Sequence, residues 1–255
     1  MGLYGGRPHA QLTVTDAIMT GFRMAMQPNF VIPILVIGVI VNAIVYAAFV
    51  PLIVGLVVGD TDATGILNGG LILSSLLGAL IAGVIGGIVV NLYGQVWATM
   101  ASVGEPPTMQ AAFARVAERW VAILGAGIVV AVAGLGIFII GAILAAALGA
   151  VGILLLLVAV VVAIFVGARL SLAGWLAADG SAAMDAVRGS WEMSASKVLL
   201  IIGWGLAAGI VFGIMGGILG AILGLIPLIG QPIAATIGAA FGYGSGVTIY
   251  RRVRA

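Results

Sequence analysis

The sequence predicts an all-helical integral membrane protein, with six transmembrane helices arranged as three hairpins in one polytopic domain, residues 1–255. Composition is the first observation behind this class. Hydrophobic residues make up 63% of the chain and charged residues only 7%, against about 25% charged in ordinary soluble domains. The second observation is a set of long uncharged stretches, and the third is the one-sided placement of the basic residues. A soluble globular protein and a disordered chain are both excluded.

Each uncharged stretch is tested against the roughly 20 apolar residues that a span needs. The stretch 120–168 has 49 residues, and a helix of that length would measure about 73 Å, more than twice the hydrocarbon thickness of about 30 Å. It must therefore hold two helices, and we place the turn at Gly149–Gly152 because glycine tolerates turn dihedral angles. The predicted spans are 30–58, 66–103, 120–147, 151–177, 198–226 and 233–250.

The charges predict the orientation in the membrane. With six spans, every basic residue falls on one side, and the other side receives Asp60 and Asp62. The positive-inside rule then places both termini in the cytoplasm, so we expect a multi-pass protein of the cytoplasmic (plasma) membrane. The C-terminal cluster Arg251, Arg252 and Arg254 is expected to attract anionic lipid headgroups.

A cytoplasmic amphipathic helix is predicted to lie in the membrane interface before each hairpin. The three segments are Thr15–Gln27, Thr108–Arg119 and Ser181–Ser196, and each opens with a plausible N-cap residue, which in the first is Thr15 or Thr13. In the first segment, the apolar face is expected to comprise Ile18, Phe22 and Met26. The chain then consists of three similar units, each an interfacial helix followed by a hairpin of two spans. These units are either a parallel repeat or three independent hairpins with similar linkers.

Few residues are available for chemistry. The chain has no Cys and a single His, His9, in its N-terminal tail. We therefore predict no catalytic residues, no metal site, no cofactor and no enzymatic activity. The net charge of +2 gives no reason to expect a nucleic-acid partner. No Asp, Glu or Lys lies within a predicted span, so the spans hold no carboxylate or amine that could form a proton relay.

Two sets of polar residues are candidate sites. Contact with anions or lipid headgroups is assigned to Arg169, Arg188 and Lys197, because Arg binds phosphate in a bidentate manner. For Arg169, the alternative is that it extends to the interface or pairs with an acidic neighbour. A polar path within the membrane is assigned to Asn42, Asn91 and Gln95; the alternative is that these amides form hydrogen bonds between helices.

Glycines recur at four-residue spacing in the last two spans. The absence of side chains on one face lets two helix backbones approach closely. We expect these helices to pack on each other or on another subunit through Gly205, Gly209, Gly213, Gly217, Gly238, Gly242 and Gly246.

One region resembles a known family. It comprises the stretch Ala168-Arg169-Leu170-Ser171-Leu172-Ala173, then Asp179-Gly180, then Ala183–Met193 with its Ser190-Trp191 pair. This layout resembles the YciC-like group of six-span prokaryotic membrane proteins, which is related to the membrane domain of glycerophosphodiester phosphodiesterases. The soluble catalytic domain of those enzymes has no counterpart here, so the resemblance implies a prokaryotic membrane protein of unassigned function.

The function predicted from these features is that of a non-enzymatic structural or accessory subunit in the cytoplasmic membrane. Its partners would be the lipid bilayer and either further copies of itself or another membrane subunit. The alternative is a transporter or a component of a lipid-handling permease, because six spans with a leading interfacial helix also resemble permeases of the ABC type in outline.

Overall fold

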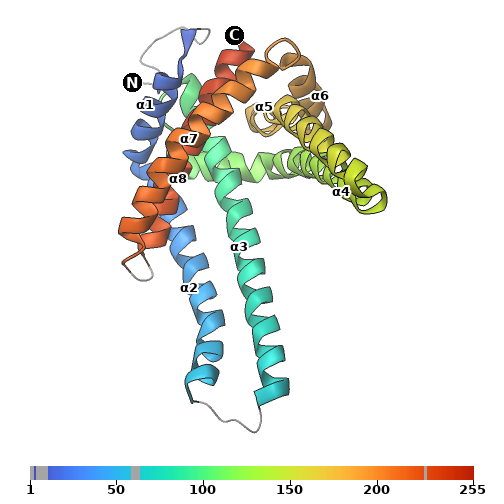
Figure 1. Ribbon diagram of the computed structural model, residues 1–255. Coiled ribbons are helices and arrows are strands. Elements are labelled where there is room, and N and C mark those ends of the chain that lie inside the picture. The colour runs from blue at the N-terminus through green and yellow to red at the C-terminus, as the bar shows by residue number, and fades with distance from the viewer. Residues whose placement is uncertain (1–2, 4–10, 59–63, 227–228) are drawn as a thin grey trace.

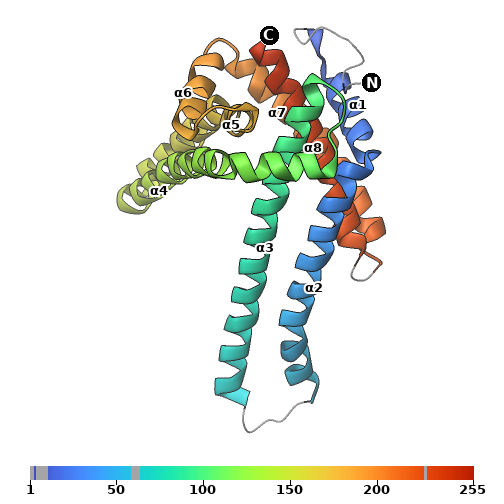
Figure 2. The same cartoon turned by 180° about the vertical axis from the view of Figure 1, so that it is seen from behind.

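The computed structural model describes residue 3 and residues 11–58, 64–226 and 229–255, and the side chains of these except at 51–58, 64–71 and 150. All regular structure in this part of the chain is helical (Figures 1 and 2). The eight helices are α1 (Val14–Ala25), α2 (Pro28–Val58), α3 (Thr64–Val103), α4 (Met109–Leu170), α5 (Ala173–Asp179), α6 (Ala183–Met193), α7 (Val198–Leu223) and α8 (Gly230–Arg254).

The predicted membrane class is confirmed at the level of a multi-span helical protein. Five helical segments are long and apolar enough to cross a bilayer: Pro28–Val50, Ile72–Val103, Met109–Gly149, Val151–Asp179 and Val198–Leu223. Two of these come from α4, which folds back on itself at Gly149, where φ is 56° and ψ is −127°. The turn that the length argument requires is therefore at the predicted place, on a residue type that accepts a positive φ.

The sixth predicted span, 233–250, forms α8 but is not among the five apolar segments. Its position in the fold explains its composition. Helix α8 packs against α1, α2, α3 and α7, and its buried residues include Thr236, Ser245 and Thr248. A helix surrounded by protein is not selected for apolar side chains in the way that a lipid-facing helix is.

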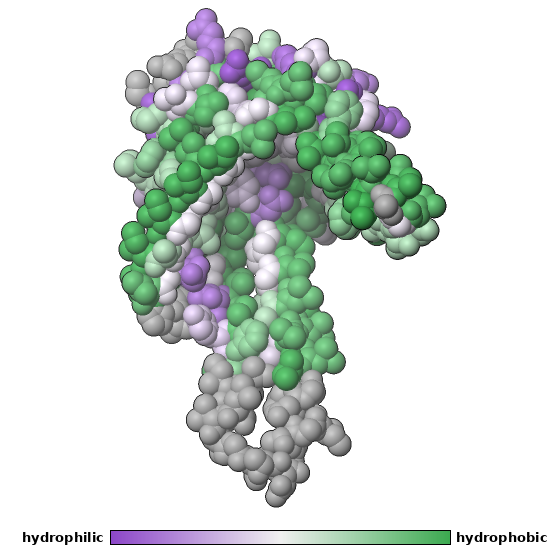
Figure 3. Space-filling view, viewed as in Figure 1, coloured by the Kyte–Doolittle hydropathy of each residue, from purple (hydrophilic) through white to green (hydrophobic). Residues whose placement is uncertain are grey.

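The three hairpins leave a shared head in different directions (Figures 1 and 2). The α2–α3 hairpin extends away from the head, α7 and α8 run beside its upper part, and the α4 hairpin lies across it. Both chain ends lie at the head (Figure 1). Hydrophilic atoms gather there, whereas the surface below the head is mostly apolar with two smaller hydrophilic patches (Figure 3). Asp60 and Asp62, predicted for the opposite side, lie outside the described residues.

The first predicted interfacial helix forms, and small residues make up its buried face. Helix α1 begins after Thr13, whose side chain and Asp16 form a reciprocal capping box. Its buried residues are Ala17, Thr20, Gly21 and Met24. In the predicted apolar face of Ile18, Phe22 and Met26, Phe22 is 43% and Met26 77% exposed, and the contact of this face with the membrane interface stays a prediction. Small residues are buried because α1 lies directly on α8, where a Cβ on Gly244 would come within 2.6 Å of the Gly21 nitrogen.

The second predicted interfacial helix does not exist as a separate element. Thr108 caps the helix as expected, accepting a hydrogen bond from the Ala111 N–H. The helix then continues without interruption through Arg119 and Trp120 into the third span. Nothing at that point breaks a helix, because the segment holds neither Pro nor Gly and is rich in Ala, Glu and Arg.

The third predicted interfacial helix corresponds to α6, although it starts two residues later than Ser181. Its N-cap is Ala182, which supplies no side-chain bond. The fourth apolar segment, Val151–Asp179, covers the predicted span, but it is divided: α4 stops at Leu170, and residues 173–179 form the separate short helix α5.

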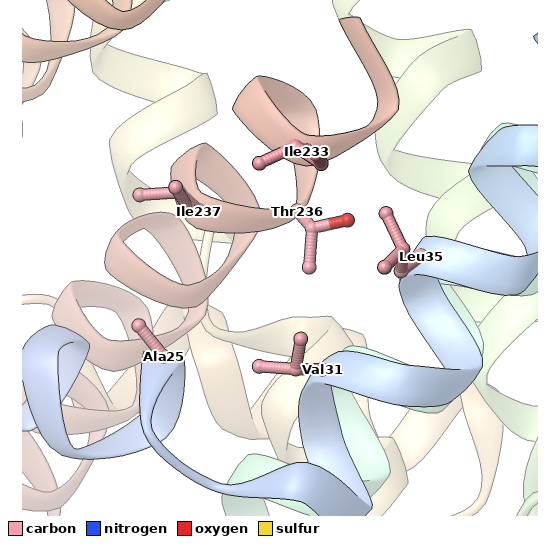
Figure 4. Close-up of a pocket in the computed structure, with 6 residues that line it drawn as sticks. All are labelled: Ala25, Val31, Leu35, Ile233, Thr236 and Ile237. Atoms are coloured by element: carbon pink, nitrogen blue, oxygen red, sulfur yellow. The ribbon is translucent and has the colours of Figure 1, made fainter. Parts of the chain in front are cut away.

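Two apolar hollows lie on α2. A small pocket of about 60 Å³ lies between α1, α2 and α8 (Figure 4), and its only hydroxyl, on Thr236, donates within its own helix to the carbonyl of Pro232. A larger groove of about 420 Å³ runs between α2 and α3 from Ile37 to Ile44 and from Gly78 to Val89.

Candidate functional site

Helices α3, α5 and α8 meet in a junction that combines the buried polar groups of the head. Three glycines, one on each helix, make room for a large side chain of a neighbouring helix. These pairs are Gly94 with Tyr243, Gly174 with Gln95 and Gly246 with Trp175. A Cβ atom added to any of these glycines would overlap the large side chain that packs on it. The three helices therefore interlock in a cycle, in which each one accepts a side chain from another.

A buried ion pair closes this junction on the side of the head. The Arg251 side chain is 6% exposed and that of Asp179 is 19% exposed, with a nearest N···O distance of 3.2 Å. Arg251 also donates from Nε to Ser102 Oγ at 2.7 Å and from an Nη to the carbonyl of Thr99 at 3.2 Å. Tyr250 donates its hydroxyl proton to the same carboxylate at 2.8 Å. A single guanidinium thus bonds α8 to α5 and to α3.

The other cations at the end of α8 also form bonds within the head. Arg254 pairs with Asp179 and bonds the Tyr250 hydroxyl at 2.6 Å. Arg252 donates to the carbonyl of Leu12 at 2.7 Å and lies over the Trp204 ring. The predicted role of this C-terminal cluster as a lipid-attracting end is therefore wrong for Arg251, which is 5% exposed. The helix period explains this, since positions 251 and 252 point about 100° apart.

Below the ion pair, the junction contains amides and aromatic rings. Gln95 donates to the Asn91 carbonyl oxygen at 3.0 Å, and the Tyr243 hydroxyl lies 3.4 Å from the same oxygen. Trp175 is in edge contact with Tyr243 and stacks on Tyr250. The Gln95 Oε1 atom is buried without a hydrogen-bond partner.

Of the predicted polar path, Asn91 and Gln95 therefore lie together on α3, whereas Asn42 lies on another helix. Asn42 is on α2, next to Val41, and Val41 lies against Gly86 of α3. Gly86 is five residues from Asn91, which is about 7.5 Å along the helix axis.

The three predicted anion-binding residues lie at different places in the head. Arg169 is half-buried, donates to the carbonyl of Trp191 at 2.6 Å and stacks 4.2 Å from its ring. Its own carbonyl accepts hydrogen bonds from Ser190 and Ser194. Arg169 therefore fastens the end of α4 to α6.

Lys197 and Arg188 differ from each other in environment. Lys197 is half-buried and donates to the carbonyl of Val253 at 2.7 Å, which ties the start of α7 to the end of α8. Arg188 is exposed on α6. Within the part of the chain that the structure describes, neither Lys197 nor Arg188 forms a hydrogen bond or ion pair with Arg169.

The predicted packing glycines lie mostly in open space. Helices α7 and α8 do lie side by side, but a Cβ would meet no atom within 4 Å at Gly205, Gly209, Gly213, Gly217, Gly238 or Gly242. Gly246 contacts Trp175 of α5. The glycines that carry close backbone approach are Gly21 and Gly244, where α1 crosses α8.

Sequence reasoning missed the Asp179–Arg251 pair. One signal was available: Gly244, Thr248 and Arg251 follow one another at four- and three-residue spacing, which places them on one face of α8. Such a face is unsuited to lipid and indicates a protein neighbour.

Within the described residues, no group of three or more His, Asp or Glu side chains is placed to hold a metal ion. A comparison with models of known protein families found no match, and neither the curated proteins nor the solved structures contain a significant relative of this chain. The fold and the contacts above therefore carry the functional argument: the protein is an integral membrane protein with several spans.

Proposed function

We propose that the protein is a non-enzymatic structural or accessory subunit of a prokaryotic cytoplasmic membrane, with both termini cytoplasmic, and that it associates with a second copy of itself through α7. The resemblance to the YciC-like group is part of this proposal. The observation that carries it is the unoccupied surface of α7.

That surface has a groove and a ridge side by side. The groove is formed by Gly205, Gly209, Gly213 and Gly217, each of which is exposed. The ridge follows one position later and consists of large aliphatic side chains that are more than half exposed: Leu206, Ile210, Ile214 and Ile218.

A surface of this kind is complementary to itself. If a twofold axis runs parallel to α7, the ridge of each copy enters the groove of the other. Two copies inserted by the same charge rule have the same orientation in the membrane, so such a dimer is parallel. Close backbone approach through glycine then supplies the van der Waals contact that drives association in lipid.

The test is dimerisation in liposomes, measured by energy transfer between labelled copies over a range of protein-to-lipid ratios. Gly209→Ile fills the groove. An overpacked contact costs about 1–3 kcal/mol, which corresponds to an increase of about 5- to 150-fold in the dimer dissociation constant.

Gly127→Ile is the matched control. Gly127 is also exposed and open, but it lies on α4 and not on α7. We expect this variant to dimerise like the unmodified protein. Monomers at every ratio for the unmodified chain, or equal losses in the two variants, would refute the proposal.

The second candidate is a lipid-handling permease component, and one observation favours it. The groove of about 420 Å³ between α2 and α3 is lined by aliphatic side chains and two glycines, which suits an acyl chain. A permease of the ABC type requires a cytoplasmic ATPase. ATP hydrolysis by a co-purified ATPase that rises when this chain is added would favour this candidate over the structural role.

A further inference from the structure

We infer that the head contains a phosphate-binding site, formed by Arg115 and Arg119 of α4 at the turn that leads into α6, and that its ligand is the phosphate of an anionic lipid. This site differs from the anion contacts predicted from the sequence, and it does not depend on self-association through α7.

Both arginines converge on Gly180. Arg119 donates from one Nη to the Gly180 carbonyl at 2.8 Å. The second Nη of Arg119 and an Nη of Arg115 lie 3.5 and 3.8 Å from the position that a Cβ on Gly180 would occupy. Gly180 has a φ of 134°, a conformation that favours glycine. The turn therefore places no side chain between the two guanidinium groups.

The start of α6 adds to the positive potential at the same place. Ala183, its first residue, packs on Gly125 of α4, one helix turn and a half beyond Arg119. The N-cap residue of α6, Ala182, has no side chain that could accept a hydrogen bond from the N–H groups of the first turn. These N–H groups give the start of the helix a partial positive charge.

Three acidic residues are close in sequence, and none of them bonds Arg119 within the described structure. Glu118 pairs with Arg115 at 3.0 Å, in an ion pair whose carboxylate is 64% exposed. Asp185 is exposed in the first turn of α6 and forms no hydrogen bond or ion pair with either arginine within the described structure. Asp179, next to Gly180, is bonded to Arg251, Arg254 and Tyr250 instead. Two cations and a helix N-terminus thus face two exposed carboxylates, of which only Glu118 is paired with an arginine of the site.

The depth of the site favours a lipid over a free anion. Trp120 and Val121, which directly follow Arg119, are 49% and 62% exposed. From there to the turn at Gly149 the surface of α4 is apolar, with Ile128, Val132 and Leu135 also exposed. The arginines therefore lie where the charged head ends and the apolar surface begins, which is the level of the phosphate groups of a bilayer.

The proposal is tested by native mass spectrometry of the detergent-solubilised protein, titrated with phosphatidylglycerol or with phosphatidylcholine of the same acyl chains. We expect preferential binding of phosphatidylglycerol. Arg115→Gln should weaken it about five-fold and Arg115→Gln/Arg119→Gln by about 30-fold, as expected for roughly 1 kcal/mol per arginine. Arg115→Gln keeps the test valid if loss of Arg119 disturbs the α5–α6 turn, because Arg115 contacts only the exposed Glu118 through its side chain.

Arg23→Gln is the control, since it removes the same charge from an exposed position on α1, outside the α4–α6 turn, and should change binding less than two-fold, as a distant surface charge is largely screened. An equal loss in Arg23→Gln and Arg115→Gln, or no preference between the two lipids, overturns the site. A parallel titration with inorganic phosphate distinguishes the sources: displacement of the lipid at low millimolar phosphate would show a free-phosphate site and overturn the lipid assignment.

Discussion

The ion pair between Asp179 and Arg251 gives the sharpest prediction about stability. Asp179→Asn removes the carboxylate and leaves the Arg251 guanidinium, 6% exposed, without the charge of its Asp179 partner. Removal of one partner from a buried pair costs about 3–5 kcal/mol, because the other charge stays buried. At about 2–4 °C per kcal/mol for a chain of this size, we expect the midpoint of thermal unfolding to fall by about 6–20 °C.

The opposite substitution should cost about as much, for a different reason. In Arg251→Met, Asp179 keeps Arg254 and the Tyr250 hydroxyl as partners. The loss then includes the hydrogen bonds of Arg251 with Ser102 and Thr99, at about 1.5–3 kcal/mol each for bonds to a charged group, or about 3–6 kcal/mol for the two. The double variant should be more stable than Asp179→Asn alone, because no unpaired buried charge remains.

Arg254→Gln is the control for this series. The Arg254 side chain is 49% exposed, and an exposed pair contributes about 0–1 kcal/mol. Unfolding is followed in detergent by the fluorescence of the five tryptophans, one of which, Trp175, stacks on Tyr250 in the same junction, and by limited proteolysis. An unchanged midpoint for Asp179→Asn, or an equal loss in Arg254→Gln, would refute the account of the junction.

Three further predictions concern single positions. Gly244→Ala should lower the free energy of unfolding by about 1–3 kcal/mol, because the added Cβ meets the α1 backbone at 2.6 Å. Gly242→Ala, in open space, should leave the free energy of unfolding unchanged or raise it by up to about 1 kcal/mol. Thermal unfolding checks both. Gly149→Ala should cost about 1–3 kcal/mol through backbone strain at a φ of 56°, and Gly136→Ala, open and helical, should cost nothing. Leu148→Cys at the tip of the α4 hairpin should react with a membrane-impermeant maleimide only from the outside of intact cells; the absence of any other Cys makes the readout specific, and labelling only in inverted vesicles would contradict the predicted topology.

The sequence predicts well those features that depend on length and on local residue type. The turn at Gly149 follows from an uncharged stretch too long for one span, which contains a glycine near its middle. The start of α1 lies at Thr13, one of the two predicted cap residues, and Asp16 completes the capping box. Neither feature needs knowledge of what the helix packs against, so periodicity, length and capping chemistry are sufficient.

Features that depend on neighbouring helices could not be predicted in the same way. The pairing of Asp179 with Arg251 joins residues 72 positions apart, and its existence follows only from the position of α5 next to α8. Charge counting treats Arg251, Arg252 and Arg254 alike, although Arg251 bonds both α3 and α5, Arg254 bonds α5 through Asp179, and Arg252 bonds Leu12. The buried face of α1 is of the same kind: side-chain hydrophobicity points to Ile18 and Phe22, whereas the close crossing with Gly244 buries Gly21.

The direction of the α4 hairpin has a consequence for how the protein sits in a bilayer. Beyond Ala126, which is buried, the first arm of α4 exposes large apolar side chains, among them Ile128, Leu135 and Phe138, so it cannot lie at the surface with one side in water. It lies across the α2–α3 hairpin (Figures 1 and 2). The base of the α4 hairpin packs in the head through Ile123 and Ala126 on one arm and, after the other arm, through Leu172 and Ala173. The apolar surface beyond this base must therefore be covered by lipid or by another protein, because the described part of the chain leaves it exposed.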